Sequence, residues 1–156
     1  MNKIHFIFCL HNHQPNGNFD FVFEKAFQQA YRPFLEAIQK FPTLKFTLHY
    51  TGVLLEWIGK NHPDFLKILR ARVKSGQIEM LSGGYYEPIL AVIPLVDQTG
   101  QIQKLTTSVK KMTGYTATGM WLAERVWEPS LPASLREAGI EFTALDDTHF
   151  KYAGVP

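Results

Sequence analysis

The order of strand-like and helix-like segments is the feature that most limits the folds open to this chain. Short runs rich in β-branched and aromatic residues alternate with segments whose apolar residues recur at helical spacing. We predict strands at 4–10, 45–51, 77–82, 119–123 and 140–145. Between them we predict helices at 23–41, with a kink at Pro33, and at 54–58, 63–75, 97–113 and 131–138. This alternation predicts parallel strands with right-handed helical crossovers, in either a doubly wound sheet or a barrel.

The helix boundaries follow from residues that start or stop a helix. Pro63 is tolerated in a first helical turn, and Gly76 ends the helix that Pro63 begins. Asp97 is predicted to cap the next long helix, which Gly114 closes.

Polar and aromatic side chains gather where the predicted strands end, which favours the barrel. In a parallel barrel these ends converge on one face, where the strand-to-helix loops carry the active site. A dinucleotide-binding sheet would instead need a glycine-rich loop after the first strand, and 11–15 (His-Asn-His-Gln-Pro) is not one. The residues at or near these strand ends are His11, His13, His49, Tyr50, Glu79, Glu124, Asp146 and Asp147. We therefore predict an α/β fold with a parallel (β/α) barrel.

Composition and charge narrow the class of protein. The chain has 156 residues, of which 46% are hydrophobic, enough for the core of one domain over 1–156. The net charge of +2, with both signs interspersed, gives no reason to expect nucleic acid or an anionic membrane as a partner. Cys9 is the sole cysteine, which excludes an internal disulfide. His5 interrupts the first apolar run and no cleavage site follows, so we expect no signal peptide and predict a cytoplasmic protein.

A carboxylate stands between two indoles at 121–127 (Trp-Leu-Ala-Glu-Arg-Val-Trp). Indole faces suit pyranose rings, and an ionised carboxylate is the usual nucleophile or stabiliser when a glycosidic bond breaks. Strand alternation would put Trp121 and Glu124 on opposite faces, so for both to serve one site the strand must end between them. Arg125 would keep nearby carboxylates ionised. The alternative is a core tryptophan pair with a surface glutamate, and Trp127 in particular suits packing as well as sugar binding.

His11 and His13 are two residues apart, so on a strand their side chains share one face. They suit a metal pair, a pair of partners for substrate hydroxyls, or two structural histidines. A catalytic zinc needs at least three protein ligands. The candidates for further ligands are His49, Glu79, Asp146, Asp147 and His149.

Several other residues have two interpretations each. Glu79 lies inside an apolar strand, so it should either face a polar cavity or pair with an arginine such as Arg125. Asp146 and Asp147 suit a metal pair or a cap for the following turn, and we favour the cap for at least one of them. The loop at 85–86 (Tyr-Tyr) suits a sugar cleft or plain packing.

Ordered motifs along the chain resemble glycoside hydrolase family 57, most closely its 4-α-glucanotransferase and α-amylase branch. The segments 11–15, 76–79 (Gly-Gln-Ile-Glu) and 121–127 match the first three motifs of the family in order and approximate spacing. The likeness continues through 134–140 and 146–150 and covers essentially the whole chain.

The resemblance implies an incomplete (β/α)7 barrel, with about five strands here, and retaining chemistry on α-1,4-glucans without metal or cofactor. By matching motif, Glu124 is expected to be the catalytic nucleophile. His11, His13, Glu79 and Trp121 are expected to bind the substrate sugar. An α-glucan or maltooligosaccharide is the expected partner, and the number of subunits stays open, a homo-oligomer included.

The family's acid/base aspartate belongs to a fourth motif that this sequence does not reach. We therefore interpret 1–156 as the N-terminal part of the catalytic domain and expect it to be inactive, or nearly so, by itself. Two alternatives remain open: a metal-dependent polysaccharide deacetylase or amidohydrolase using His11, His13 and an aspartate, and a noncatalytic glucan-binding module.

Overall fold

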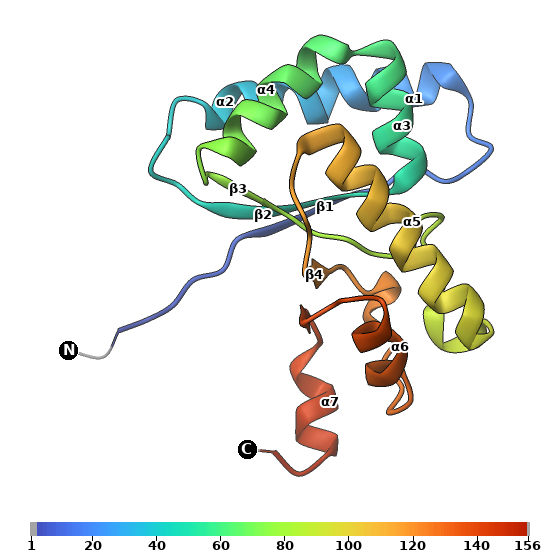
Figure 1. Ribbon diagram of the computed structural model, residues 1–156. Helices are drawn as coiled ribbons and strands as arrows, with labels where there is room; N and C mark the ends of the chain where they lie inside the picture. Colours follow the sequence, from blue (N-terminus) through green and yellow to red (C-terminus); the bar gives the residue numbers. More distant parts are fainter. Residues whose placement is uncertain (1–2, 156) are drawn as a thin grey trace.

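The computed structural model describes residues 3–155 as an α/β fold with parallel strands (Figure 1). Three strands form one sheet in the order β1-β2-β3, and β4 pairs with β5. A parallel bridge between Ser82 and Met120 links β3 to β4, so the strands follow one another in chain order. This order is that of a barrel rather than of a doubly wound sheet, and the barrel is incomplete in this chain. The strands are β1 Cys9–Asn12, β2 Phe46–Tyr50, β3 Ile78–Met80, β4 Gly119–Met120 and β5 Phe142–Thr143.

Helices connect these strands and cover one face of the three-stranded sheet, as Figure 1 shows for α1 to α4. The long helix α5 begins beside α6 and runs up to α3 and α4, so it joins the two parts of the helix layer (Figure 1). The helices are α1 Asp20–Ala26, η1 Phe27–Tyr31, α2 Arg32–Ile38, α3 Gly52–Asn61, α4 Pro63–Lys74, η2 Leu90–Val92, α5 Leu95–Thr113, η3 Ala123–Arg125, α6 Leu131–Glu137 and α7 Asp147–Tyr152. Among residues 3–155, none of them has the length and apolar character needed to span a bilayer.

The interruption predicted at Pro33 is confirmed, and it takes the form of a π-helical turn. Phe27–Tyr31 is π-helix, directly before the helix that contains Pro33. Proline has no N–H to donate, and its ring crowds the carbonyl one turn earlier. The wider turn accommodates this defect without ending the helix, so the aromatic stripe of α1 and η1 continues into α2.

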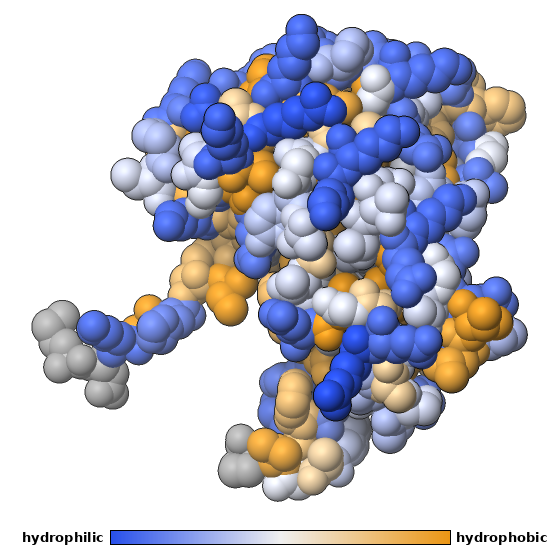
Figure 2. Space-filling view, in the orientation of Figure 1, coloured by the Kyte–Doolittle hydropathy of each residue, from blue (hydrophilic) through white to orange (hydrophobic). Residues whose placement is uncertain are grey.

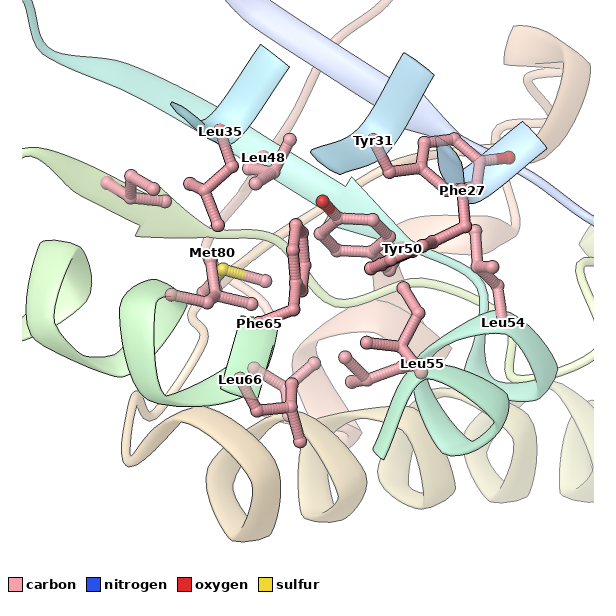
Figure 3. Packing of buried hydrophobic residues seen from close by; sticks show 14 of the residues in the cluster. Phe27, Tyr31, Leu35, Leu48, Tyr50, Leu54, Leu55, Phe65, Leu66 and Met80 are labelled. Atoms are coloured by element: carbon pink, nitrogen blue, oxygen red, sulfur yellow. The ribbon is translucent and has the colours of Figure 1, made fainter. Parts of the chain in front are cut away.

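The main core lies between the three-stranded sheet and its helices. Leu48 and Met80 on the sheet are fully buried with Phe27, Leu54 and Phe65 from the helices, as Figure 3 shows. Because side chains alternate along a strand, the neighbouring residues of β1, β2 and β3 face the opposite side of the sheet. That side borders a hollow of about 310 Å³, lined by Ile7, Cys9, Thr47, Glu79, Leu81, Met120, Phe142, Thr143 and Ala144.

The prediction of a buried strand at 4–10 is wrong in position. The strand begins only at Cys9, and Ile4 and Ile7 are 91% and 81% exposed. The N-terminal segment leads away from the sheet in Figure 1 and stands clear of the body in Figure 2. The apolar residues of this segment predict burial. Among the described residues, however, β1 stands at the edge of its sheet, and no strand on its outer side covers them.

Asp97 is not the N-cap that we predicted. The helix α5 begins at Leu95 with Pro94 at the N-cap position, which places Asp97 in the first turn. An acidic side chain there still suits the positive end of the helix dipole. Gly114 closes α5 in the left-handed conformation, with φ of 83°, as predicted.

Candidate active site

Two histidines from neighbouring strands meet at the carboxyl edge of the sheet. His11 in β1 pairs in register with His49 in β2, so both side chains lie on the face opposite the helices. The two Nδ1 atoms are 2.8 Å apart, and the rings are stacked with centroids separated by 4.9 Å. His49 is fully buried, and burial lowers its pKa to about 3, so this ring is neutral.

The residues around His11 are fixed by their own hydrogen bonds. Asn12 donates from its side chain to the carbonyl of His49 at 3.1 Å, which adds a side-chain hydrogen bond to the last pairs of β1 with β2. Gln14 donates to the Tyr31 hydroxyl at 3.1 Å, and that hydroxyl donates to the carbonyl of His13 at 3.2 Å. The loop after β1 is therefore held both to the sheet and to the first helical segment.

Glu87, from the loop after β3, joins the two histidines of the first motif. Its Oε1 lies 3.0 Å from His11 Nε2, and its Oε2 is bonded to His13 Nδ1. The carboxylate side chain is only 7% exposed. Burial favours the neutral acid, but the hydrogen bonds from His11 and His13 outweigh it and lower the pKa of Glu87. An ionised carboxylate thus holds two imidazoles.

The loop that carries Glu87 is anchored on both sides. Tyr85 is buried, and its ring lies so close to Gly52 that a side chain at Gly52 would collide with it. The carbonyl of Tyr85 accepts from the Gly52 N–H at 2.9 Å. On α5, Gln101 accepts from the N–H groups of Tyr85 and Tyr86. This assigns Tyr85 to packing, while the half-exposed Tyr86 accepts a hydrogen bond from Lys104.

Trp121 lies on His11. The ring centroids are 4.5 Å apart and the ring planes differ by 12°. The backbone N–H of Trp121 donates to the Ser82 carbonyl at 2.8 Å, which extends the pairing of β3 with β4 by one residue. One face of the indole is therefore covered by His11. The Arg125 guanidinium also lies over the indole, 5.8 Å from the ring centroid, so a sugar ring can use only the surface that these two residues leave open.

The predicted strand over 119–123 is shorter in the structure and ends one residue before Trp121, so strand alternation does not fix the side on which Glu124 lies. β4 stops at Met120, and Ala123–Arg125 form a single 3-10 turn. Glu124 is exposed and has a φ of 51°, and Arg125 follows with a φ of 53°. Among residues 3–155, Glu87 is the one other non-glycine residue with positive φ. Such conformations cost about 1–3 kcal/mol each and concentrate at functional sites.

Glu79 is apart from the histidines. It pairs in register with Thr47, two residues before His49, and so lies deeper in the barrel than the histidines. Its half-buried carboxylate accepts from the Tyr115 hydroxyl at 3.3 Å and borders the hollow between the two sheets. The alternative pairing with Arg125 is wrong, because Arg125 Nε lies 2.8 Å from Asp146 Oδ1.

The remaining acidic and histidine candidates are engaged outside this cluster. Asp146 stands at the N-cap position of α7, but its side chain makes no capping hydrogen bond and pairs with Arg125 instead. Asp147 pairs with Lys151 one turn later in the same helix. His149 Nε2 donates to the Arg125 carbonyl at 3.2 Å. Trp127 packs against the second core cluster, which favours packing over a sugar platform.

Three side chains of the site could hold a metal ion: His11, His13 and Glu87. Their ligand atoms lie within 4.8 Å of one another. Two histidines and a carboxylate form a chemically suitable set for zinc. In the geometry described here, however, the same atoms are already paired with one another.

Glu87 was not among the site residues predicted from the sequence, and His49 was predicted only as a candidate metal ligand. A signal for Glu87 was available, because it follows Gly83 and Gly84 in the loop after the third strand. Like Glu124, Glu87 is an acidic residue in a loop that follows a predicted strand, where a barrel carries its active site.

Comparison with known proteins places the chain in a family. The family model for glycosyl hydrolase family 57 matches residues 7–154. Over 155 residues, the chain is 52% identical to a 4-alpha-glucanotransferase of Thermococcus litoralis and 49% identical to an alpha-amylase of Pyrococcus horikoshii. Each comparison covers 99% of this chain but only 23% and 24% of the respective relative. The chain thus spans about a quarter of the length of these relatives.

Solved structures agree with this placement. The crystal structure of the Thermococcus litoralis 4-alpha-glucanotransferase matches with a TM-score of 0.96 and 52% identity, over 100% of this chain and 24% of that one. A family 4 carbohydrate esterase from Streptomyces lividans, in complex with acetate, matches with a TM-score of 0.65 and 14% identity, over 90% of this chain and 62% of the esterase. The second likeness is one of fold alone. The match over nearly all of the chain shows that it belongs to glycosyl hydrolase family 57.

Proposed function

We propose that this chain supplies the nucleophile and part of the sugar-binding surface of a retaining enzyme that acts on α-1,4-glucans. The names of the relatives, 4-alpha-glucanotransferase and alpha-amylase, support this substrate class. The observation that carries the proposal is the stacking of Trp121 on His11 at 4.5 Å, which unites the first and third sequence motifs. The five parallel strands would then be part of a (β/α)7 barrel.

Glu124 is the proposed nucleophile. Its carboxylate would attack the anomeric carbon of a glucose unit as the glycosidic C–O bond breaks, and so form a covalent glycosyl ester. A sugar hydroxyl would then resolve the ester in transfer, and water would resolve it in hydrolysis. Its exposure and its left-handed backbone at the end of β4 support this role.

Retaining chemistry also needs a carboxylic acid to protonate the leaving oxygen, about 5–5.5 Å from the nucleophile. Glu87 is unsuited to that role, because its hydrogen bonds to the histidines lower its pKa and keep it ionised. We infer that the acid/base lies outside these 156 residues. The isolated chain is accordingly expected to show little or no turnover of maltooligosaccharides.

The other proposed sugar-binding residues have unequal support. Trp121 and His13 lie at the open edge of the site. Glu79 lies deeper, and the hollow it borders supports a role further inside the completed barrel.

A metal-dependent hydrolase is the second candidate function, favoured by the ligand set of His11, His13 and Glu87. Two of the aspartate candidates for that chemistry, Asp146 and Asp147, are instead paired with Arg125 and Lys151. A noncatalytic glucan-binding module would use the same sugar-binding residues as the first proposal. The two functions differ only in whether Glu124 acts as a nucleophile.

Calorimetric titration with maltotriose tests the sugar site, with cellotriose as the control for linkage. We expect wild type and Glu124→Gln to bind maltotriose alike, because the amide keeps the shape of the side chain. Trp121→Ala should bind roughly 2- to 10-fold more weakly, since loss of a stacking face costs about 0.5–1.5 kcal/mol. Equal binding of both sugars, or none of maltotriose by folded wild type, would refute the proposed substrate class.

A further inference from the structure

Both ring nitrogens of His11 are already occupied by the protein. Nδ1 lies 2.8 Å from His49 Nδ1, and Nε2 lies 3.0 Å from Glu87 Oε1. The stack with Trp121 covers one face of the ring. An imidazole in this position has no nitrogen left for a ligand.

The position of each hydrogen follows from Glu87. An ionised carboxylate can only accept, so the nitrogens that face it, His11 Nε2 and His13 Nδ1, carry hydrogen. With Nε2 protonated, a neutral His11 has its lone pair at Nδ1. His49 must then donate from its own Nδ1, which leaves His49 Nε2 as a lone pair.

The surroundings of His49 Nε2 agree with this assignment. The atom is buried and has no hydrogen-bond partner among the described residues. A Cβ atom built at Gly83 would lie 2.8 Å from it, so a Cα–H bond of Gly83 points at Nε2. A lone pair tolerates a C–H group there, whereas an N–H would collide with it. A doubly protonated His11 would force hydrogen onto this atom, leaving a buried donor unsatisfied at a cost of about 1–3 kcal/mol.

His13 differs from His11 in having one nitrogen free of the cluster. Its Nδ1 is bonded to Glu87, and its side chain is 40% exposed. With the hydrogen held at Nδ1, a neutral His13 presents Nε2 outwards as an acceptor.

From this geometry we propose that Glu87 is a positioning residue that gives the two histidines different roles. It locks His11 as a neutral support for Trp121, and it makes His13 the imidazole that accepts a hydrogen bond from a sugar hydroxyl. The part that concerns the sugar rests on the proposed function. The part that concerns the hydrogens is independent of it.

Long-range proton–nitrogen NMR spectra of the ¹⁵N-histidine-labelled chain test the proposal, since they distinguish protonated from lone-pair nitrogens. Without sugar at neutral pH, we expect hydrogen on Nε2 of His11 and on Nδ1 of both His13 and His49. Single histidine-to-asparagine variants assign the signals. Any other pattern in the wild type overturns the proposal.

Glu87→Gln gives a sharper result, because an amide accepts at one end and donates at the other. It cannot accept from both rings. His49 is kept in place by Gly83, so His11 should retain its form while His13 moves its hydrogen from Nδ1 to Nε2. Glu24→Gln is the matched control, since Glu24 lies 2.8 Å from His62 Nε2 and should alter His62 alone. An unchanged His13 in a folded Glu87→Gln chain overturns the proposal.

Titration with maltotriose then separates the two claims. The largest shift should occur at His13 Nε2, with His11 nearly unchanged. A larger sugar-induced chemical-shift change at His11 than at His13 overturns the separate roles proposed for the two histidines. Expected hydrogen positions without any sugar-induced shift would contradict the proposed function, while supporting the positioning role of Glu87.

Discussion

The indole of Trp121 lies on the imidazole of His11, with centroids 4.5 Å apart and planes within 12° of parallel. These residues are more than a hundred positions apart in the sequence and come from the first and fourth strand regions. Their contact brings the ends of β1 and β4 together across the open side of the sheet, and it fixes where the segment that carries Glu124 begins.

A double-mutant cycle on this pair measures the contact directly. We expect His11→Ala and Trp121→Ala each to lower the free energy of unfolding. The two effects should be non-additive by about 0.5–1.5 kcal/mol, the usual value for stacked rings. Urea unfolding followed by circular dichroism gives the four values. Full additivity within error would mean that the stack does not form in solution.

The buried imidazole of His49 should make the chain sensitive to acid. Burial lowers the pKa of His49 to about 3 in the folded state, against an ordinary value of 6.5. Between these values the unfolded chain binds more protons, so the free energy of unfolding falls as the pH is lowered from about 6.5 to about 3, by up to about 1.4 kcal/mol per pH unit for one group.

His49→Asn removes the titrating group, while its amide can still donate to His11. Its free energy of unfolding should therefore vary less with pH than that of the wild type, whereas His5→Asn, at an exposed position, should not differ from it. Urea unfolding between pH 4 and pH 7 makes the comparison. An equal pH dependence in wild type and His49→Asn would contradict the neutral, buried state.

Gly83 should not tolerate a side chain. A Cβ atom there would lie 2.8 Å from His49 Nε2 and 3.0 Å from the Trp121 carbonyl oxygen. Gly83→Ala should therefore lower the free energy of unfolding by about 1–3 kcal/mol, as overpacking does. Gly100→Ala is the matched control, because nothing lies within 4 Å of that position in α5 and alanine favours a helix by up to about 1 kcal/mol. Equal stability of the two variants would contradict the close contact between Gly83 and His49.

Much of the fold could be predicted because the apolar periodicity is local. The five strand regions and the helices between them were identified, and so was the interruption at Pro33. The first strand was placed too early because apolar residues at 4–8 indicate burial without naming the partner that provides it. Its position depends on neighbouring strands, which local patterns do not describe.

The site was predictable where a motif and a strand end coincide, as for His11, His13 and Trp121, which the structure brings together. Glu87 could have been selected from its place after the third strand, but its pairing with both histidines could not, because that pairing depends on a left-handed residue in a loop anchored by Gln101 and Gly52. A polar surrounding for Glu79 was predicted because a buried, unpaired carboxylate is costly. That cost does not say which residue is the partner, so the contact with Tyr115 could not be predicted.

Removal of metal should leave the chain unchanged if the cluster of His11, His13 and Glu87 is held by its own hydrogen bonds. We expect dialysis against a chelator to leave the thermal unfolding midpoint unaltered, and equimolar zinc to add little. A ligand that binds only the folded chain would raise this midpoint, and a tighter ligand would raise it more. Stoichiometric zinc that survives dialysis in the wild type and is lost in Glu87→Gln would favour the metal-dependent hydrolase instead.

The covalent role of Glu124 is tested most directly with an activated sugar. A 5-fluoro-α-glucosyl fluoride releases fluoride without a general acid, so it bypasses the residue that this chain is not expected to supply. Mass spectrometry of digested protein should find one glycosyl group on the peptide that contains Glu124, and none in Glu124→Gln. A label on another carboxylate, or no label on folded wild-type chain that binds maltotriose, would contradict the account.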